Sequence, residues 1–145
     1  MLQIGEPAPL FEAESTQGTV KLGELIGKRP VVLIFYPMDE TPGCTAQLCA
    51  VRDSKKQYES IGAVVIGVNP AGMDAHRKFA ANHGLDFPIA VDEGGSIRKM
   101  YGVGKMLGLF LQQRVVYGID KQGKIAFARK GSPSAEEIVA ALGRA

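Results

Sequence analysis

Apolar residues in this chain fall into continuous runs, separated by stretches in which apolar positions recur every three or four residues. Continuous runs bounded by proline, glycine or charged residues are typical of strands buried on both faces of a sheet. Five runs have this character: VVLIFY (31–36), AVVIGV (63–68), FPIAV (87–91), RVVYGI (114–119) and KIAFAR (124–129). The last two flank DKQG, which predicts a hairpin turn with glycine at a position of positive φ. A short edge strand is also expected around Thr19–Leu22, within a loop-rich first 30 residues.

The intervening segments have helical spacing. Helices are predicted at 45–60, 72–83 and 96–101, and a last helix in SPSAEEIVAAL. In this last helix Ser132 is expected as the N-cap and Pro133 as the first helical residue. Strands that alternate with helices predict an α/β fold with a central mixed β-sheet flanked by helices on both faces. A chain of 145 residues is expected to form a single domain, residues 1–145.

Composition and charge narrow the range of partners. Seventeen basic and fifteen acidic residues give a net charge of only +2, so neither nucleic acid nor an anionic membrane is expected as a partner. The first residues, MLQIGEPAPLFEAES, lack a basic region followed by an apolar run, so no secretory signal is expected. The cytoplasm is the expected location, where cysteines stay reduced. The short tail after the last predicted helix offers no arm for domain swapping, so a monomer is expected.

Both cysteines of the chain lie in the stretch MDETPGCTAQLCAVRD (38–53). Cys44 follows a buried strand through a short loop and stands at the start of the next predicted helix. Free N–H groups and the helix dipole at such a position favour the thiolate, which is the reactive form of a cysteine. Asp39 and Glu40 oppose this effect if they point toward the sulfur.

Cys49 follows Cys44 by five positions. In a regular helix this spacing puts the two Cα atoms roughly 8–9 Å apart, whereas a disulfide tolerates no more than about 7 Å. The two sulfurs can therefore bond only after a helical turn opens, which describes a redox cycle with a conformational switch. Cys49 alone would also suit a small apolar residue facing the core. A shared metal site with His76 and His83 is disfavoured, because residues seven apart on a helix are separated by about 10 Å along its axis. Each histidine is expected at the surface.

Longer motifs around these residues resemble a known family. Pro37, Thr41 and Cys44 form the pattern P-x-x-x-T-x-x-C, which resembles the active-site motif of the peroxiredoxins. The string YPMDETPGCTAQLCAVRD is similar to the peroxiredoxin Q branch, also called the bacterioferritin comigratory protein group. Further similar segments are IGEPAPLFEAESTQG, AVVIGV, HRKFAANHGLDFPIAVDE and RVVYGIDKQGKI. The resemblance implies a thioredoxin-like fold and thiol-dependent reduction of hydrogen peroxide and alkyl hydroperoxides.

The resemblance also implies roles for individual residues. Cys44 corresponds to the peroxidatic cysteine and Cys49 to the resolving cysteine, which forms an intramolecular disulfide with it. Thr41 supplies an active-site hydroxyl, Pro37 shields the thiolate from solvent, and Arg114 matches the active-site arginine.

Peroxide cleavage explains why these residue types are needed. The oxygen that departs gains negative charge, and donors fixed in a water-poor pocket stabilise it. Arg114, Thr41 and the backbone N–H groups of Gly43 and Cys44 are the expected donors, and they form the predicted peroxide-binding site. Gln47, one turn past Cys44, is expected to orient Arg114 through its side-chain carbonyl.

Three positions depart from the family pattern, one of them Asn69–Pro70, which replaces the frequent Ser-Pro after the second long strand. Gln47 stands where many members carry Glu, and Met38 stands where Lys is common. Met38 in place of Lys removes a positive charge near Cys44.

The predicted cycle needs a reductant but no cofactor. Oxidised Cys44 would condense with Cys49, and thioredoxin, with glutaredoxin as a second possibility, would reduce the disulfide. No metal, haem, flavin or nucleotide is expected. An alternative is a redox-sensing module in which oxidation melts the helix and the apolar segment MLGLFL (106–111) binds a partner protein. A lid beside the active site is the favoured interpretation of that segment.

Overall fold

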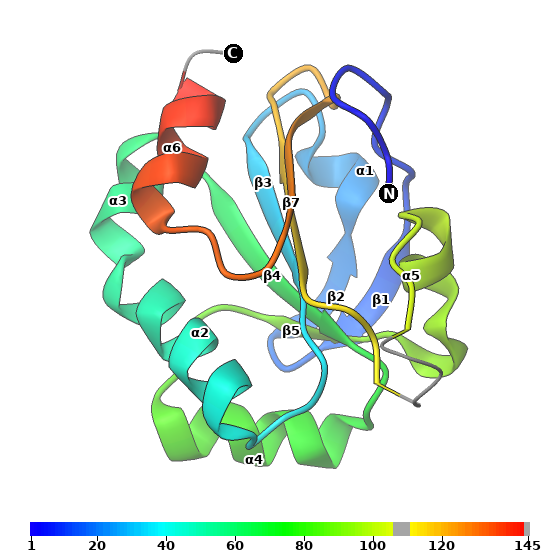
Figure 1. Cartoon of the computed structure of the whole chain (residues 1–145), viewed down its shortest axis with the longest axis vertical. Helices are drawn as coiled ribbons and strands as arrows, with labels where there is room; N and C mark the ends of the chain where they lie inside the picture. The colour runs from blue at the N-terminus through cyan, green and yellow to red at the C-terminus, as the bar shows by residue number, and fades with distance from the viewer. Residues whose placement is uncertain (106–110, 144–145) are drawn as a thin grey trace.

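The computed structural model of the chain describes residues 1–105 and 111–143, which form a seven-stranded sheet of order β2-β1-β5-β4-β3-β6-β7 (Figure 1). The strands are β1 (Glu12–Ser15), β2 (Gly18–Lys21), β3 (Val31–Phe35), β4 (Val64–Asn69), β5 (Ile89–Val91), β6 (Val115–Ile119) and β7 (Ile125–Lys130). The helices are α1 (Leu22–Leu25), α2 (Pro42–Asp53), α3 (Lys55–Ser60), α4 (Met73–His83), the 3₁₀ turn η1 (Glu93–Gly95), α5 (Ser96–Met100) and α6 (Ala135–Gly143). Over the same described ranges, no helix has the length and apolar character to cross a membrane.

Strand β3 lies inside the sheet, between β4 and β6. It pairs in parallel with β4 and antiparallel with β6, so that Leu33 faces Ile66 on one side and Tyr117 on the other. All five of its residues are buried, as the run of apolar residues predicts. The predicted mixed α/β sheet is confirmed: β3, β4 and β5 are parallel, and β1, β6 and β7 add antiparallel pairs.

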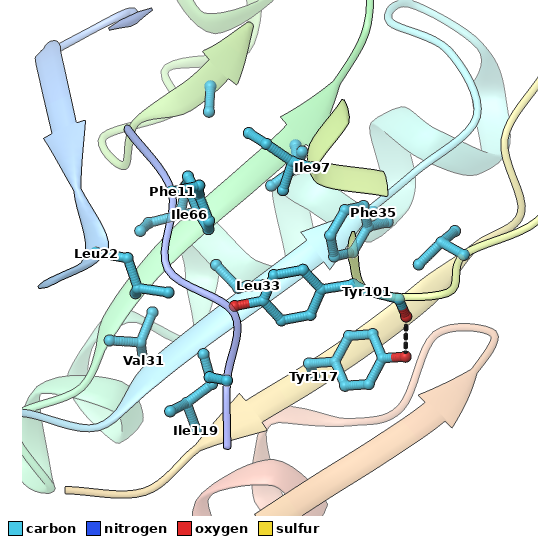
Figure 2. Packing of buried hydrophobic residues seen from close by; sticks show 14 of the residues in the cluster. Phe11, Leu22, Val31, Leu33, Phe35, Ile66, Ile97, Tyr101, Tyr117 and Ile119 are labelled. Atoms are coloured by element: carbon cyan, nitrogen blue, oxygen red, sulfur yellow. Dashed lines mark hydrogen bonds between the residues drawn. The ribbon is translucent and has the colours of Figure 1, made fainter. Parts of the chain in front are cut away.

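Alternate residues of β3 serve two separate cores, because successive side chains of a strand point to opposite faces. One core packs Leu33 and Phe35 against residues of α1, α5 and the N-terminal segment. Figure 2 shows its aromatic centre, where Tyr117 donates a hydrogen bond of 2.5 Å to the carbonyl of Tyr101. The other core packs Val32 and Ile34, together with Tyr36 directly after the strand, against α2, α3, α4 and α6, and this second core contains Cys44.

Several predicted boundaries are wrong. The helix expected at 45–60 begins three residues earlier, because Pro42 occupies its first turn, and it is interrupted at Ser54, which separates α2 from α3. The last helix begins at Ala135 rather than Pro133. Its cap is Ser134, whose hydroxyl accepts a hydrogen bond of 3.1 Å from the N–H of Glu137.

The first 30 residues contain more regular structure than predicted. The edge strand expected near Thr19 is β2, and it forms a hairpin with the unpredicted strand β1. Leu22 ends the hairpin and begins the short helix α1, where it is fully buried. Both missed elements have only four residues, too few to display a clear period.

Candidate active site

Cys44 lies in the first turn of α2, just beyond the carboxyl end of β3. The loop between the two elements ends at Thr41, and Pro42 begins the helix. The first N–H groups of a helix have no acceptor within it, and they give this end a partial positive charge. The Cys44 side chain is buried against the second core, with only 1% of its surface exposed. The sulfur therefore lies in a dry site at the positive end of a helix.

Arg114, directly before β6, contacts this sulfur. Its Nη2 donates a hydrogen bond of 3.2 Å to Cys44 Sγ, and its Nη1 donates to Gln47 Oε1. Cys44 and Gln47 are three residues apart on α2, so one guanidinium spans a single face of the helix. A Cβ atom on Gly43 would lie 3.4 Å from Arg114 Nη2, at the close limit of ordinary van der Waals contact, so the guanidinium lies directly against this position.

This arrangement places hydrogen-bond donors and a positive charge beside the sulfur. Arginine stays charged at any working pH and presents several N–H donors in one plane. A charge-assisted hydrogen bond in a buried site is stronger than one in water. Gln47, itself only 8% exposed, holds one amino group of Arg114 and leaves the other on the sulfur. The chemical consequence is a cysteine prepared to act as a nucleophile.

Thr41 and Pro37 border the site on the loop before α2. Thr41 occupies the N-cap position, but its hydroxyl donates a hydrogen bond of 3.0 Å to the carbonyl of Met38 and does not cap the helix. The carbonyl of Pro37 accepts a hydrogen bond of 3.1 Å from Asn69 Nδ2. The structure thus brings Cys44, Gln47 and Arg114 into direct contact, and places Thr41 and Pro37 on the adjoining loop.

Cys49 also lies on α2, and both cysteines are free thiols. Cys49 is half-buried at the edge of the second core. The helix is regular across both positions, so the separation expected from helix geometry holds and the pair is unbonded.

The two acidic residues before α2 bind histidines of α4. Asp39 Oδ2 lies 2.7 Å from His76 Nδ1, and Glu40 Oε1 lies 2.6 Å from His83 Nε2. The surface position expected for His76 is wrong, because this residue is completely buried. A carboxylate beside it accounts for its burial, since buried polar groups require partners. Each of the two acidic side chains thus has a histidine partner on α4.

The side chains of Asn69, Gln112 and Tyr36 hold the end of β3 and the loop after it, a role that sequence reasoning missed. Asn69 Nδ2 and Gln112 Nε2 both donate to the carbonyl of Tyr36, at 2.9 and 2.7 Å. The Tyr36 hydroxyl donates to Asp39 Oδ1 at 2.5 Å. Burial, together with the Asp39 carboxylate, raises the pKa of Tyr36 far above its ordinary value, so the hydroxyl keeps its proton. These contacts join positions far apart in the sequence, and no local motif indicates them.

Two further expectations from the sequence concern a metal site at the histidines and the segment 106–111. Each histidine is bound to a separate carboxylate, and among residues 1–105 and 111–143 no three His, Cys, Asp or Glu side chains form a group suited to a metal ion. The segment MLGLFL (106–111), except for Leu111, lies outside the described residues.

Comparison with known sequences places this site in a family context. Residues 4–128 match the model of the AhpC/TSA family. The chain is 44% identical over 124 residues to a chloroplastic peroxiredoxin Q of Triticum aestivum, covering 85% of this chain but 57% of that protein. It is 38% identical over 130 residues to peroxiredoxin Bcp of Bacillus subtilis (strain 168), covering 86% of this chain and 82% of that protein. The cytoplasmic location expected from the sequence is contradicted by the plant relatives, which are named as chloroplastic proteins.

Solved structures agree with the sequence comparison. Peroxidoxin BcpB from Mycobacterium tuberculosis superimposes with a TM-score of 0.89 at 28% identity, covering 99% of this chain and 98% of that one. The predicted thioredoxin-like peroxiredoxin fold is thereby confirmed. The chain belongs to the AhpC/TSA family, and within it to the group of peroxiredoxin Q and Bcp.

Proposed function

We propose that this chain is a thiol peroxidase that reduces hydrogen peroxide and alkyl hydroperoxides. The chain spans only 57% of its wheat relative, so the proposal rests first on its own site. The observation that carries it is the buried sulfur of Cys44, at the positive end of α2 and 3.2 Å from Arg114 Nη2. Membership of the family supports the same conclusion.

In the first step the Cys44 thiolate attacks one peroxide oxygen. A sulfur–oxygen bond forms while the O–O bond breaks, and the departing oxygen leaves with the electron pair and takes up a proton to become water or an alcohol. Cys44 becomes a sulfenic acid, the first and reversible stage of cysteine oxidation. Arg114 and the free N–H groups of the first turn of α2 stabilise the growing charge. Thr41 would contribute by rotating its hydroxyl from the Met38 carbonyl toward the peroxide.

In the second step the Cys49 sulfur attacks the Cys44 sulfenic acid, and water leaves as the disulfide forms. Because the two Cα atoms of an intact helix are too far apart for this bond, the first turns of α2 must unwind. A dithiol then reduces the disulfide and becomes oxidised itself. Thioredoxin is the proposed reductant, with glutaredoxin as the other candidate. The monomeric state and the absence of nucleic-acid and membrane partners remain predictions.

Peroxide consumption with a thioredoxin system tests the proposal. Wild-type protein should consume peroxide repeatedly, Cys44→Ser should consume none, and Cys49→Ser should react once and then stop. Repeated turnover by Cys44→Ser would contradict the assignment of the nucleophile. A single oxidation without turnover in the wild type would favour the alternative, a redox-sensing module.

A further inference from the structure

Helix α4 contacts the chain on both sides of the segment that carries the two cysteines. In Figure 1, α4 passes the N-terminal end of α2 at the bottom of the view. Before α2, Glu40 binds the last two residues of α4. Toward the end of α2, Arg52 binds the same end of α4. The residues between these two contacts, 41–51, include both cysteines.

The contact before α2 holds an unusual backbone conformation. Glu40 has φ of 62°, in the left-handed region that residues other than glycine rarely adopt. Its Oε1 lies 2.6 Å from His83 Nε2, and its Oε2 accepts a hydrogen bond of 2.6 Å from Asn82 Nδ2. Such a conformation persists only where surrounding contacts fix it, and residues in this state cluster at switch regions. The Glu40 side chain is therefore an anchor for the loop rather than an unconstrained surface group.

The contact at the end of α2 uses the backbone of the same histidine. Arg52 Nη1 donates to the carbonyl of His83, while its Nε donates to Asp53 at 2.9 Å. Helix α4 ends at His83 and is capped by Gly84, which is left-handed with φ of 59°. Carbonyls in the last turn of a helix have no intrahelical donor, so the His83 carbonyl is available to Arg52. His83 thus contacts Glu40 with its ring and Arg52 with its backbone.

We propose that His83 is a positioning residue for the disulfide step: it fastens both ends of segment 41–51 to α4, so that disulfide formation unwinds this segment and leaves its flanks in place. This inference rests on the proposed peroxidase cycle, because only that cycle requires Cys44 and Cys49 to approach each other. The disulfide demands a local opening of α2, whereas Glu40 and Arg52 keep the flanking backbone attached to α4. Fixed ends restrict the conformations of the opened segment, so α2 re-forms readily after reduction and returns Cys44 to Arg114.

The other histidine of α4, His76, binds the same loop at a buried position. His76 is completely buried, and its two ring nitrogens face Asp39 Oδ2 at 2.7 Å and the carbonyl of Asn69 at 3.1 Å. Asp39 and Glu40 are neighbours in the loop, so α4 binds two consecutive carboxylates with its two histidines. The loop before Thr41 is thereby attached to α4 at two depths, one buried and one at the surface.

Hydrogen exchange measured by mass spectrometry on the full chain tests the proposal. The reduced form is compared with the disulfide form, which is prepared with diamide so that the comparison does not depend on peroxide turnover. In the wild type, loss of protection on oxidation should be confined to peptides within 41–51. Loss that extends through 36–40 and the last turn of α4 would overturn the proposal.

Variants at Glu40 distinguish the attachment of the loop to α4 from a general effect on protein stability. Glu40→Gly tolerates the left-handed backbone but removes the carboxylate, so loss of protection in the disulfide form should spread into 36–40. Turnover limited by the reductant should fall about two- to fivefold, as expected for one exposed pair, while single-turnover oxidation of Cys44 stays within about twofold. Glu40→Gln keeps an acceptor and should restore much of the wild-type pattern. An exchange pattern in Glu40→Gly identical to that of the wild type would overturn the proposal.

A surface pair elsewhere provides the matched control. Lys55 binds Asp86 at 2.9 Å with a comparably exposed side chain, and it lies on α3 outside the opened segment. Lys55→Met should leave both the exchange pattern and the turnover unchanged, and an effect equal to that of Glu40→Gly would overturn the specific role of the anchor. The wild type could form the disulfide with diamide, unwind only within 41–51 and yet consume no peroxide. This outcome would refute the proposed function but would still agree with the role of His83 in holding the flanks of the segment.

Discussion

The two halves of α2 surround their cysteines in contrasting ways. Cys44, in the first half, is 1% exposed and is bound by Arg114, which Gln47 holds in turn. Cys49, in the second half, is half-buried at the edge of the core. The loop before the first half is attached to α4 through the buried contact of Asp39 with His76. The first half thus holds one geometry around the Cys44 sulfur, whereas the second half leaves Cys49 partly exposed.

Removing His76, the buried support of the first half of α2, should have the largest effect on the free energy of unfolding. His76→Leu removes the partner of Oδ2 of the Asp39 carboxylate, which is 7% exposed, and leaves the Tyr36 hydroxyl on Oδ1. Loss of one member of a buried pair costs about 3–5 kcal/mol, so the free energy of unfolding measured in urea should fall by about that amount. Adding Asp39→Asn should recover part of the loss, because the buried charge is gone. A loss below about 1 kcal/mol would show that the contact behaves like a surface pair.

Removing the cation from the sulfur should have the largest effect on rate. Arg114→Met takes away a donor fixed 3.2 Å from Cys44 Sγ, and loss of one such donor costs about 10²–10³ in rate. Stopped-flow or rapid-quench measurement of Cys44 oxidation gives this rate directly. Arg114→Lys should recover a minor part, because lysine keeps the charge but not the planar set of donors. Arg129→Met, which removes an exposed cation paired with Glu137, should change nothing.

Removing Gln47, the second partner of the Arg114 guanidinium, should have a smaller effect on the rate of Cys44 oxidation. Gln47→Leu removes the acceptor for Arg114 Nη1 at nearly constant volume. A hydrogen bond to a charged group is worth about 1.5–3 kcal/mol, and part of this is recovered by rearrangement, so the oxidation rate should fall roughly tenfold. Gln47→Glu keeps an acceptor and should stay closer to the wild type. An unchanged rate in Gln47→Leu would mean that Arg114 is positioned by other contacts.

The exposed anchor at Glu40 should give the smallest effect, visible mainly as a pH dependence. Hydrogen bonds from Asn82 and His83 lower the pKa of Glu40. A group whose pKa is lowered by folding stabilises the protein above its ordinary pKa, and this contribution is lost as the pH falls through the lowered value. Wild type should therefore unfold at slightly higher urea concentration than Glu40→Gln at neutral pH, and the two curves should converge in acid below about pH 4. A constant difference at all pH values would contradict the titration of this contact.

Sequence patterns predicted the scaffold better than the contacts that support the site. Continuous apolar character identifies β3 as a central strand, because burial on both faces leaves no room for polar residues. The break at Ser54 was missed, since the apolar spacing continues through it, and the cap at Ser134 was assigned two residues early.

The supporting contacts of the site are non-local. His76 was expected at the surface because its partner Asp39 lies on a different element, 37 positions away. Asn69 and Gln112, which bind the Tyr36 carbonyl, carry no sequence signal of their own. Arg114 was identified only through family resemblance, because an isolated arginine before a strand does not indicate its partner. The residues that react were recognisable from their motif, whereas most of those that hold them in place required the structure.

Trapping the first oxidation product tests the central claim most directly. Cys49→Ser is mixed with one equivalent of hydrogen peroxide, quenched at short times and digested, and the oxidation state of Cys44 is read by mass spectrometry. The account predicts near-complete conversion of Cys44 to a sulfenic acid, at a rate that Arg114→Met in the same background reduces about 10²–10³-fold. Peroxide consumed while Cys44 stays a free thiol, or oxidation of Cys44 that does not respond to loss of Arg114, would contradict it.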